Sequence, residues 1–130
     1  MDKDKLLTDF ELLSFSIGKY DTRTKEQVLI DEFIYIYGLD IRLFSRVGMI
    51  VKGRYFMMWY LKGRFNGTLQ SVANCFVRKN GKDFTHDIVL HAIKTHNILL
   101  DKKFGNKKLA KKFNEIKNQL DKINPKTIIN

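Results

Sequence analysis

Hydrophobic residues recur along most of this chain at steps of three and four positions, the spacing of one face of an α-helix. The first such segment carries Leu6, Leu7, Phe10 and Leu13 and ends before Gly18. This spacing predicts a short amphipathic helix within residues 1–22. Its apolar stripe either packs on the core of the protein or binds a partner protein.

The second segment begins near Thr24, has Gln27 in its first turn and ends at Gly38, a residue suited to a helix C-cap. Its β-branched and aromatic residues would also suit a strand, but its length and the glycine stop favour a helix. Asp40 then caps a predicted short turn of helix over IRLF. Residues 45–53 contain two glycines and are predicted to form a basic connection.

Residues 55–61 read YFMMWYL and are apolar on every side of a helix. A helix of this kind is typically central and packed against several others. Asn66 and Gly67 are predicted to end it. A methionine and aromatic run belongs more often to a core than to a cofactor site, so we interpret it as core.

Two further helices follow, separated by a loop over residues 77–84. Thr68 is predicted to cap the first, TLQSVANCF, and Thr85 to cap the second. Residues at helical spacing define the apolar face of each. That face holds Leu69, Val72, Ala73 and Phe76 in the first helix, and Val89, Ala92, Ile93, His96 and Leu100 in the second.

A last helix is predicted from Leu109, Phe113, Ile116, Leu120 and Ile123, with lysines opposite and Pro125 as its stop. The chain therefore predicts an all-α fold, a compact helical bundle with a helix-turn-helix. At 130 residues it is long enough for one compact domain. We expect that domain over residues 23–124, preceded by the helix and linker of residues 1–22 and followed by a frayed tail, 125–130.

A helix-turn-helix can place the start of its second helix in the major groove of duplex DNA. Here that edge carries Thr85, His86, Asp87 and Ile88, which we predict to face base edges. The Asp87 carboxylate could accept a hydrogen bond from a cytosine amino group, although it would repel nearby phosphates. Its alternative roles are local, as a favourable charge at a helix start or as an exposed ion pair with His91.

Charge is distributed unevenly along the chain. Residues 1–45 hold six Lys or Arg and nine Asp or Glu, a net of −3, and residues 46–130 hold eighteen and five, a net of +13; together they give the total of +10. The positive charge thus lies in the part that carries the predicted helix-turn-helix. Such a part attracts a polyanion, because each phosphate that is neutralised releases condensed counterions. The alternative is a basic protein that its charge keeps in solution.

The sequence lacks the patterns of common catalytic and metal sites. His86, His91 and His96 are five residues apart, which turns each about 140° from the last on a helix, so they do not share a face. No nucleotide-binding loop of the type Gly-x-x-x-x-Gly-Lys-Ser/Thr occurs. We therefore expect no enzymatic activity, no metal, no cofactor and no small-molecule substrate.

Cys75 is the single cysteine and lies on the apolar side of its predicted helix. No disulfide can form within the chain, so a reducing compartment and a packing role for Cys75 are expected. The first residues alternate in charge where a signal peptide would be apolar, and no apolar run reaches the length of a membrane span. These features predict a cytoplasmic protein that does not contact a membrane.

Three separated motifs occur in this order: VKGRYFMMWYLKGRFNGTLQSVANCF, THDIVLHA, and the closing amphipathic helix. Together they resemble the C-terminal DNA-binding domain of the bacterial DnaA replication initiator, in the Trp-repressor-like superfamily, over about residues 28–121. The matched positions are Lys52, Gly53 and Arg54 at the opening of the apolar helix, Thr68 and Leu69 at the first motif helix, and His86, Val89, Leu90, His91 and Ala92 in the recognition signature.

The resemblance implies a duplex-DNA interface with phosphate or minor-groove contacts beside the recognition helix. On this chain the corresponding residues are Arg46, Lys52, Arg54 and Thr68. The predicted turn is longer than in the family by about five residues, and its Arg78, Lys79 and Lys82 could follow a phosphate backbone, or the loop could have no role.

The chain also departs from the family. Thr85, Asp87 and Ile88 replace an Asp and two Thr of the signature and leave His86 from the reading set, so the family's DNA sequence preference is not carried over. The family's motor module is absent from these residues.

We therefore expect a double-stranded DNA-binding protein that acts by site occupancy or recruitment in replication initiation or transcription control, without ATPase activity. The resemblance implies a bacterial cell, with a phage or mobile element as the alternative origin. The alternative function is a protein-interaction or structural protein that keeps the fold without specific DNA reading. RNA binding would use the same charge but lacks predicted exposed aromatic platforms.

Overall fold

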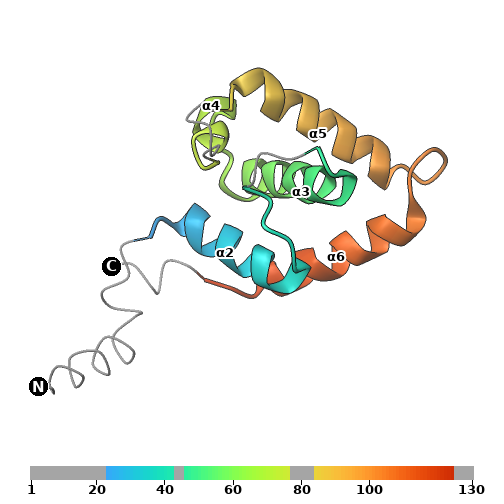
Figure 1. Ribbon diagram of the computed structural model, residues 1–130, viewed down its shortest axis with the longest axis horizontal. Coiled ribbons are helices and arrows are strands. Elements are labelled where there is room, and N and C mark those ends of the chain that lie inside the picture. The colour runs from blue at the N-terminus through green and yellow to red at the C-terminus, as the bar shows by residue number, and fades with distance from the viewer. Residues whose placement is uncertain (1–22, 43–45, 77–83, 125–130) are drawn as a thin grey trace, which may run out of the picture.

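Five α-helices account for the regular structure of residues 23–42, 46–76 and 84–124, the part of the chain that the computed structural model describes (Figure 1). No strand occurs within these residues. The prediction of an all-α fold is confirmed. The helices are α2 (Lys25–Tyr37), α3 (Gly48–Phe65), α4 (Leu69–Ala73), α5 (His86–Leu100) and α6 (Lys107–Asp121).

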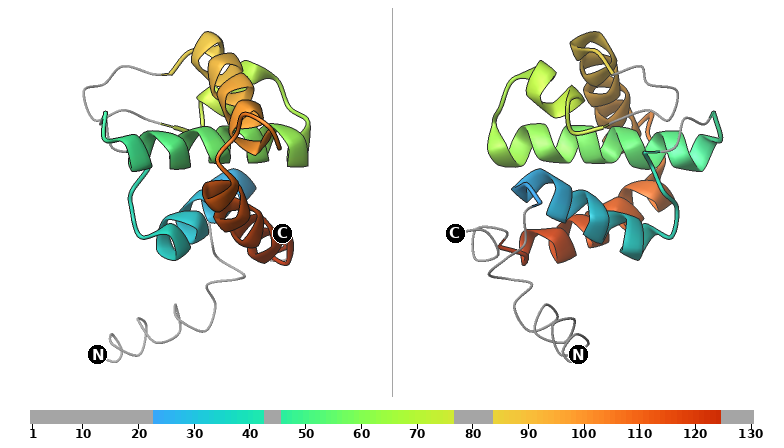
Figure 2. Two further views of the ribbon diagram at one scale, coloured as in Figure 1. Left: turned by 90° about the vertical axis from the view of Figure 1, so that its right-hand side faces the viewer. Right: turned by 60° about the vertical axis from the view of Figure 1, so that its left-hand side comes forward.

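Helix α3 lies at the centre of the arrangement. It packs against α2, α4 and α5, while α2 and α5 each also contact α6. Figure 2 shows α2 and α6 on one side of α3, and α4 and α5 on the other. The prediction that the segment around residues 55–61 is central is confirmed, because Phe56, Met57, Met58 and Leu61 are each at most 1% exposed.

Stacked aromatic rings hold helices α2, α3 and α6 together. The Phe56 ring of α3 lies 5.3 Å from the ring of Phe33 in α2 and 4.9 Å from that of Phe113 in α6, centroid to centroid. Tyr37 stacks on Phe33 at 4.8 Å and donates a hydrogen bond from its hydroxyl to the carbonyl oxygen of Met49. Buried aromatic pairs at these distances add to the area that they remove from water. The cluster joins three helices that are far apart in sequence.

Helix α2 begins and ends where the sequence predicts. The Thr24 hydroxyl accepts a hydrogen bond from the Gln27 amide, and the Gln27 side chain accepts one from the Thr24 amide, which completes a capping box. Gly38 adopts a left-handed conformation, φ 87°, and its amide donates to the Ile34 carbonyl oxygen. Both ends of α2 are therefore set by local sequence.

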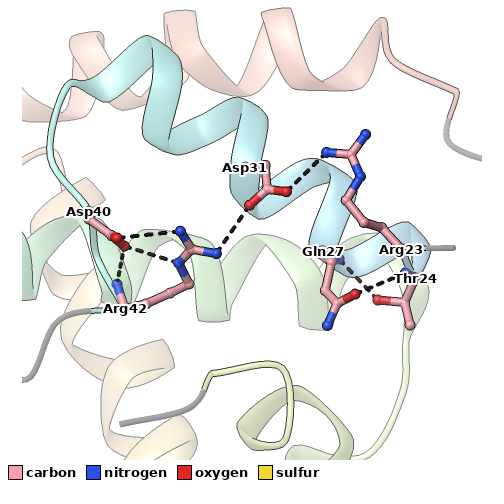
Figure 3. A network of polar contacts seen from close by, with 6 residues as sticks. All are labelled: Arg23, Thr24, Gln27, Asp31, Asp40 and Arg42. Carbon is pink, nitrogen blue, oxygen red and sulfur yellow. Dashed lines mark hydrogen bonds and ion pairs between the residues drawn. The ribbon is translucent and has the colours of Figure 1, made fainter. Parts of the chain in front are cut away.

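Asp31 of α2 connects the two segments that flank this helix (Figure 3). Its carboxylate oxygens lie 3.0 Å from Nη1 of Arg23 and 3.2 Å from Nη1 of Arg42. Asp40 also accepts hydrogen bonds from the Arg42 backbone and guanidinium, and the bonds to the guanidinium raise the pKa of Arg42. Partly exposed pairs of this kind stabilise a fold weakly. These pairs nevertheless hold the Arg42 side chain against Asp31 and Asp40 in the turn after α2.

Helix α3 starts at Gly48, so the predicted connection over residues 45–53 is wrong for residues 48–53. These residues are helical because Ile50 and Gly53 pack into the protein instead of facing water. At Gly53 an added Cβ would lie 2.6 Å from Cε2 of Tyr37 and 2.9 Å from Cγ2 of Ile41. The glycine that suggests a connection in the sequence allows α2 and α3 to approach closely.

This approach predicts opposite effects for two glycine substitutions in one helix. Gly53→Ala should lower the free energy of unfolding by about 1 to 2 kcal/mol, because its methyl group overlaps Tyr37 and Ile41. Gly63→Ala should raise it by about 0.5 to 1 kcal/mol, because no atom beyond the adjoining helix backbone lies within 4 Å of that Cβ and alanine favours a helix. Urea unfolding of both variants measures the difference. Equal effects would contradict the packing at Gly53.

The remaining helices follow the predicted apolar faces with shorter boundaries. Val72, Ala73 and Phe76 are buried, but α4 ends at Ala73 and residues 74–76 form a turn. In α5 the predicted residues Val89, Ala92 and His96 are buried; in α6 Phe113, Ile116 and Leu120 are.

Helix α6 ends at Asp121, earlier than the predicted stop at Pro125, and the Lys122 amide donates to the carbonyl oxygens of Gln119 and Leu120. The predictions for residues 1–22, 77–83 and 125–130 lie outside the described residues, as do those for residues 43–45, which include the end of the predicted helical turn over IRLF.

Candidate nucleic-acid interface

The start of α5 is an exposed helix end next to α4 (Figure 1). Thr85 occupies the predicted N-cap position with extended backbone, φ −105° and ψ 164°, but its side chain makes no capping hydrogen bond. The backbone carbonyl of Thr85 accepts from the Ile88 and Val89 amides. The hydroxyl and the first amides of this turn can therefore be offered to an acceptor such as a phosphate oxygen.

His86 and Asp87 project into solvent from the first turn, with side chains that are 59% and 81% exposed. His86 Nε2 lies 3.2 Å from Asp87 Oδ1. The ion pair suggested between Asp87 and His91 does not form; His91 Nε2 lies 3.4 Å from the Thr95 hydroxyl instead. The two polar side chains of the edge thus contact each other and remain accessible, while Ile88 is half-buried against the core.

The solvent-facing strip of α5 is longer than the sequence motif suggests. Leu90 is 40% exposed, and Lys94 and Asn97 follow it at steps of four and three. These residues share a face with His86 because such steps return to the same side of a helix. The sequence indicates this exposed strip, because Leu90, Lys94 and Asn97 follow His86 at steps of four, four and three. An exposed leucine beside a histidine can contact a thymine methyl group, and a lysine one turn farther can contact a phosphate.

The position of Lys52 relative to this edge follows from the contacts between α3 and α5. It is exposed on α3, one turn before Tyr55, whose ring meets the His91 ring edge-on at 5.6 Å. Farther along both helices, the Trp59 ring lies 4.7 Å from the His96 ring and the Trp59 Nε1 donates to Asn97. Later residues of α3 therefore face later residues of α5, so that Lys52 lies toward the first turn of α5.

Two other predicted backbone contacts are exposed in the structure. Arg46 precedes α3, and Thr68 caps α4 by accepting a hydrogen bond from the Ser71 amide. A threonine in this position can still offer its hydroxyl proton to a phosphate. Arg78, Lys79 and Lys82 lie outside the described residues.

Arg54 differs from the expectation of a phosphate contact. It is 6% exposed, its Nε donates a 2.9 Å hydrogen bond to the Ile41 carbonyl oxygen, and its guanidinium lies 5.1 Å from the centre of the Phe84 ring. A side chain held in this way cannot reach a groove while the fold is intact. The structure gives Arg54 a role in joining the segment after α2, helix α3 and Phe84, which lies two residues before α5.

His96 is buried at the contact of α3, α5 and α6. It is 2% exposed, with the rings of Phe56 and Phe113 at 5.4 Å and 5.6 Å, and its Nε2 has no hydrogen-bond partner. Burial lowers the pKa of His96 to about 4. The ring is therefore neutral at neutral pH and belongs to the core.

Cys75 is half-buried, and its thiol donates to the Ser71 carbonyl oxygen at 3.3 Å. Burial, with a smaller contribution from Glu26, raises the pKa of Cys75 to about 11. A thiol that resists ionisation is a poor nucleophile at neutral pH. The predicted packing role for Cys75 agrees with this environment.

A hollow of about 560 Å³ opens between α3, α5 and α6, lined among others by Trp59, Ile93 and Lys117. Its polar wall is a hydrogen-bonded network: the Tyr60 hydroxyl donates to Asp121, and Arg64 donates to the Tyr60 hydroxyl and to the Leu120 carbonyl oxygen. Burial and the bond to Asp121 raise the pKa of Tyr60 to about 12. These groups join the ends of α3 and α6.

Two other kinds of site are absent from the residues that the structure describes. No three His, Cys, Asp or Glu side chains lie together as a group that could hold a metal ion in this part of the chain. None of the helices seen here is both long and apolar enough to cross a membrane.

Comparisons with protein-family models, with curated proteins and with solved structures found no match to this chain. The resemblance to the DnaA C-terminal domain therefore stays a prediction from the sequence motifs. The function has to be argued from the surface itself.

Proposed function

We propose that this protein binds double-stranded DNA through a helix-turn-helix formed by α4 and α5, with the first turn of α5 in the major groove. The observation that carries the proposal is the exposed start of α5, where Thr85 makes no side-chain cap and His86 and Asp87 stand in solvent. Residues 46–130, which contain this edge, hold a net charge of +13 by sequence count, eighteen positive and five negative residues. Such an excess favours a polyanionic partner.

In this proposal each group at the interface has a distinct task. His86 and Leu90 contact base edges, and Asp87 either accepts from a cytosine amino group or orients His86. Lys52, Arg46 and Thr68 contact phosphates and fix the position of the protein on the duplex. The protein acts by occupying a site or recruiting a partner, without catalysis, in replication initiation or transcription control within the cytoplasm.

Selection from randomised duplex DNA, followed by affinity measurements over a range of salt, tests the proposal. We expect an enriched sequence motif and a logarithm of affinity that falls by about 0.9 per phosphate contact for each unit of log salt. Duplex binding with no enriched motif would remove base reading. No binding at all at low salt would favour the alternative, a protein-interaction role for the same fold.

A lysine on α3 should contribute one phosphate contact. Lys52→Gln should weaken binding to all duplexes by a similar factor and reduce the salt slope by about 0.9, because it removes one cation without touching a base. Lys62→Gln is the matched control, since Lys62 lies at the other end of α3 and its Nζ contacts the side chain of Asn66. Fluorescence anisotropy with labelled duplexes measures both. An unchanged slope for Lys52→Gln would exclude it from the interface.

A further inference from the structure

The turn between α5 and α6 is built to a fixed shape. Asp101 accepts hydrogen bonds from the amides of Lys103 and Phe104, which lower the pKa of its carboxyl, and the Gly105 amide donates to the Asp101 carbonyl oxygen. An added Cβ at Gly105 would collide with the carbonyl oxygens of Leu99 and Asp101. Asn106 then caps α6 by accepting from the Leu109 amide. The amides of Asp101 and of residues 103–106 thus all donate hydrogen bonds within the turn or to the end of α5.

This turn holds an aromatic ring in solvent. Phe104 is 75% exposed, and Ile98, on the adjoining end of α5, is 61% exposed. The ammonium group of Lys103 lies 5.3 Å from the centre of the Phe104 ring. A large apolar side chain in water is unfavourable by itself.

Lysines flank Phe104 in the sequence and continue along α6. The exposed lysines of the turn and of the adjoining part of α6 are Lys102, Lys103, Lys107, Lys108 and Lys111. Lys112 is also exposed, but its ammonium group lies 4.9 Å from the centre of the Tyr37 ring of α2. None of these lysines forms an ion pair with another described residue. Two of them occupy the first turn of α6, where the helix dipole repels positive charge and no acidic residue is present. A bound polyanion would relieve this repulsion.

We propose that this lysine face, with Phe104 at its end, is a second nucleic-acid contact that binds a single strand. An unpaired base stacks on the Phe104 ring while its phosphates lie along Lys107, Lys108 and Lys111. Exposed aromatic rings beside cations are the usual means of holding single strands without sequence preference. A duplex covers the faces of its bases, so the exposed ring favours a strand over a duplex.

The lysine face lies away from the proposed duplex site. Helix α5 has 15 residues and is about 22 Å long, and the edge at His86 and the turn at Phe104 lie at its opposite ends (Figure 1). The two contacts would then be occupied independently. A protein with both could sit where a duplex opens into a single strand. This inference goes beyond the proposed function and does not depend on it.

Binding of fluorescein-labelled oligo-deoxythymidine to the full chain, followed by anisotropy, tests the contact. Phe104→Ala should weaken binding roughly five- to tenfold through loss of base stacking, and Phe104→Tyr should restore it. Because Phe104 is mostly exposed, neither variant should unfold. The combined change Lys107→Gln and Lys111→Gln should lower the salt slope by about 1.4, at 0.7 per phosphate contact. Affinity for a hairpin-closed duplex should stay within twofold in all three.

Three results would overturn the proposal. The first is equal affinity of Phe104→Ala and wild type for the oligonucleotide. The second is an equal loss on the strand and the duplex after the lysine changes, which would make the lysines a general charge effect. The third is Phe104-dependent binding to phosphatidylglycerol vesicles without Phe104-dependent strand binding, which would assign the face to an acidic membrane surface. A protein that binds the single strand but no duplex would contradict only the proposed function.

Discussion

Arg54→Met should lower the free energy of unfolding by about 2 to 3 kcal/mol and leave duplex affinity unchanged. The substitution removes the hydrogen bond to the Ile41 carbonyl oxygen and the contact with the Phe84 ring. Methionine keeps much of the volume, so the loss reports chiefly the buried carbonyl left without a donor. Urea unfolding followed by circular dichroism gives the stability, and anisotropy with the folded variant gives the affinity.

Lys52→Met is the matched control for Arg54→Met, because it makes the same change two residues earlier at an exposed position. It should leave stability within about 0.5 kcal/mol and weaken duplex binding. The two variants thus separate a residue that joins segments of the fold from one that contacts phosphate. The opposite result would make Arg54 a phosphate ligand. In that case Arg54→Met would keep the free energy of unfolding of the wild type and lose duplex affinity as Lys52→Met does.

His96 should make the fold sensitive to mild acid. The folded pKa of about 4 lies below the ordinary value of 6.5, so the unfolded chain binds a proton first as the pH falls. The stability is fully present above pH 6.5 and decreases until pH 4. The difference of about 2.5 in pKa corresponds to a loss of about 3 kcal/mol.

His96→Leu tests this pH dependence. Unfolding measured by circular dichroism at several pH values should show a loss between pH 6.5 and 4 that is smaller by about 3 kcal/mol than in the wild type. His91→Leu is the control on the exposed side of α5, and it should keep the acid loss because His96 is still present. If His96→Leu left the pH profile unchanged, His96 would bind a proton as readily in the folded state as in the unfolded state.

Features set by neighbouring residues could be predicted from the sequence. The capping box of Thr24 and Gln27, the left-handed Gly38 and the inner faces of α5 and α6 all follow from spacing and residue type. Each depends on atoms within about one helical turn, where local preferences are strong.

Features set by distant contacts could not be predicted. Gly53 suggests a connection until Tyr37 and Ile41 are seen against it. Arg54 is typical of a phosphate contact until the carbonyl of Ile41, thirteen residues earlier, is found beside it. Phe104 is a different case, because its exposure depends on a local turn around Asp101 whose shape the hydrophobic pattern does not reveal. Tertiary contacts decide whether such residues face the core or the solvent.

The central claim is that the start of α5 meets duplex DNA. A titration of the ¹⁵N-labelled protein with a short duplex, followed by amide NMR shifts, tests it most directly. We predict the largest shifts at Thr85, His86, Asp87 and Ile88, with smaller ones near Lys52 and Thr68. Shifts confined to the lysine face of α6, with residues 85–88 unchanged, would contradict the account.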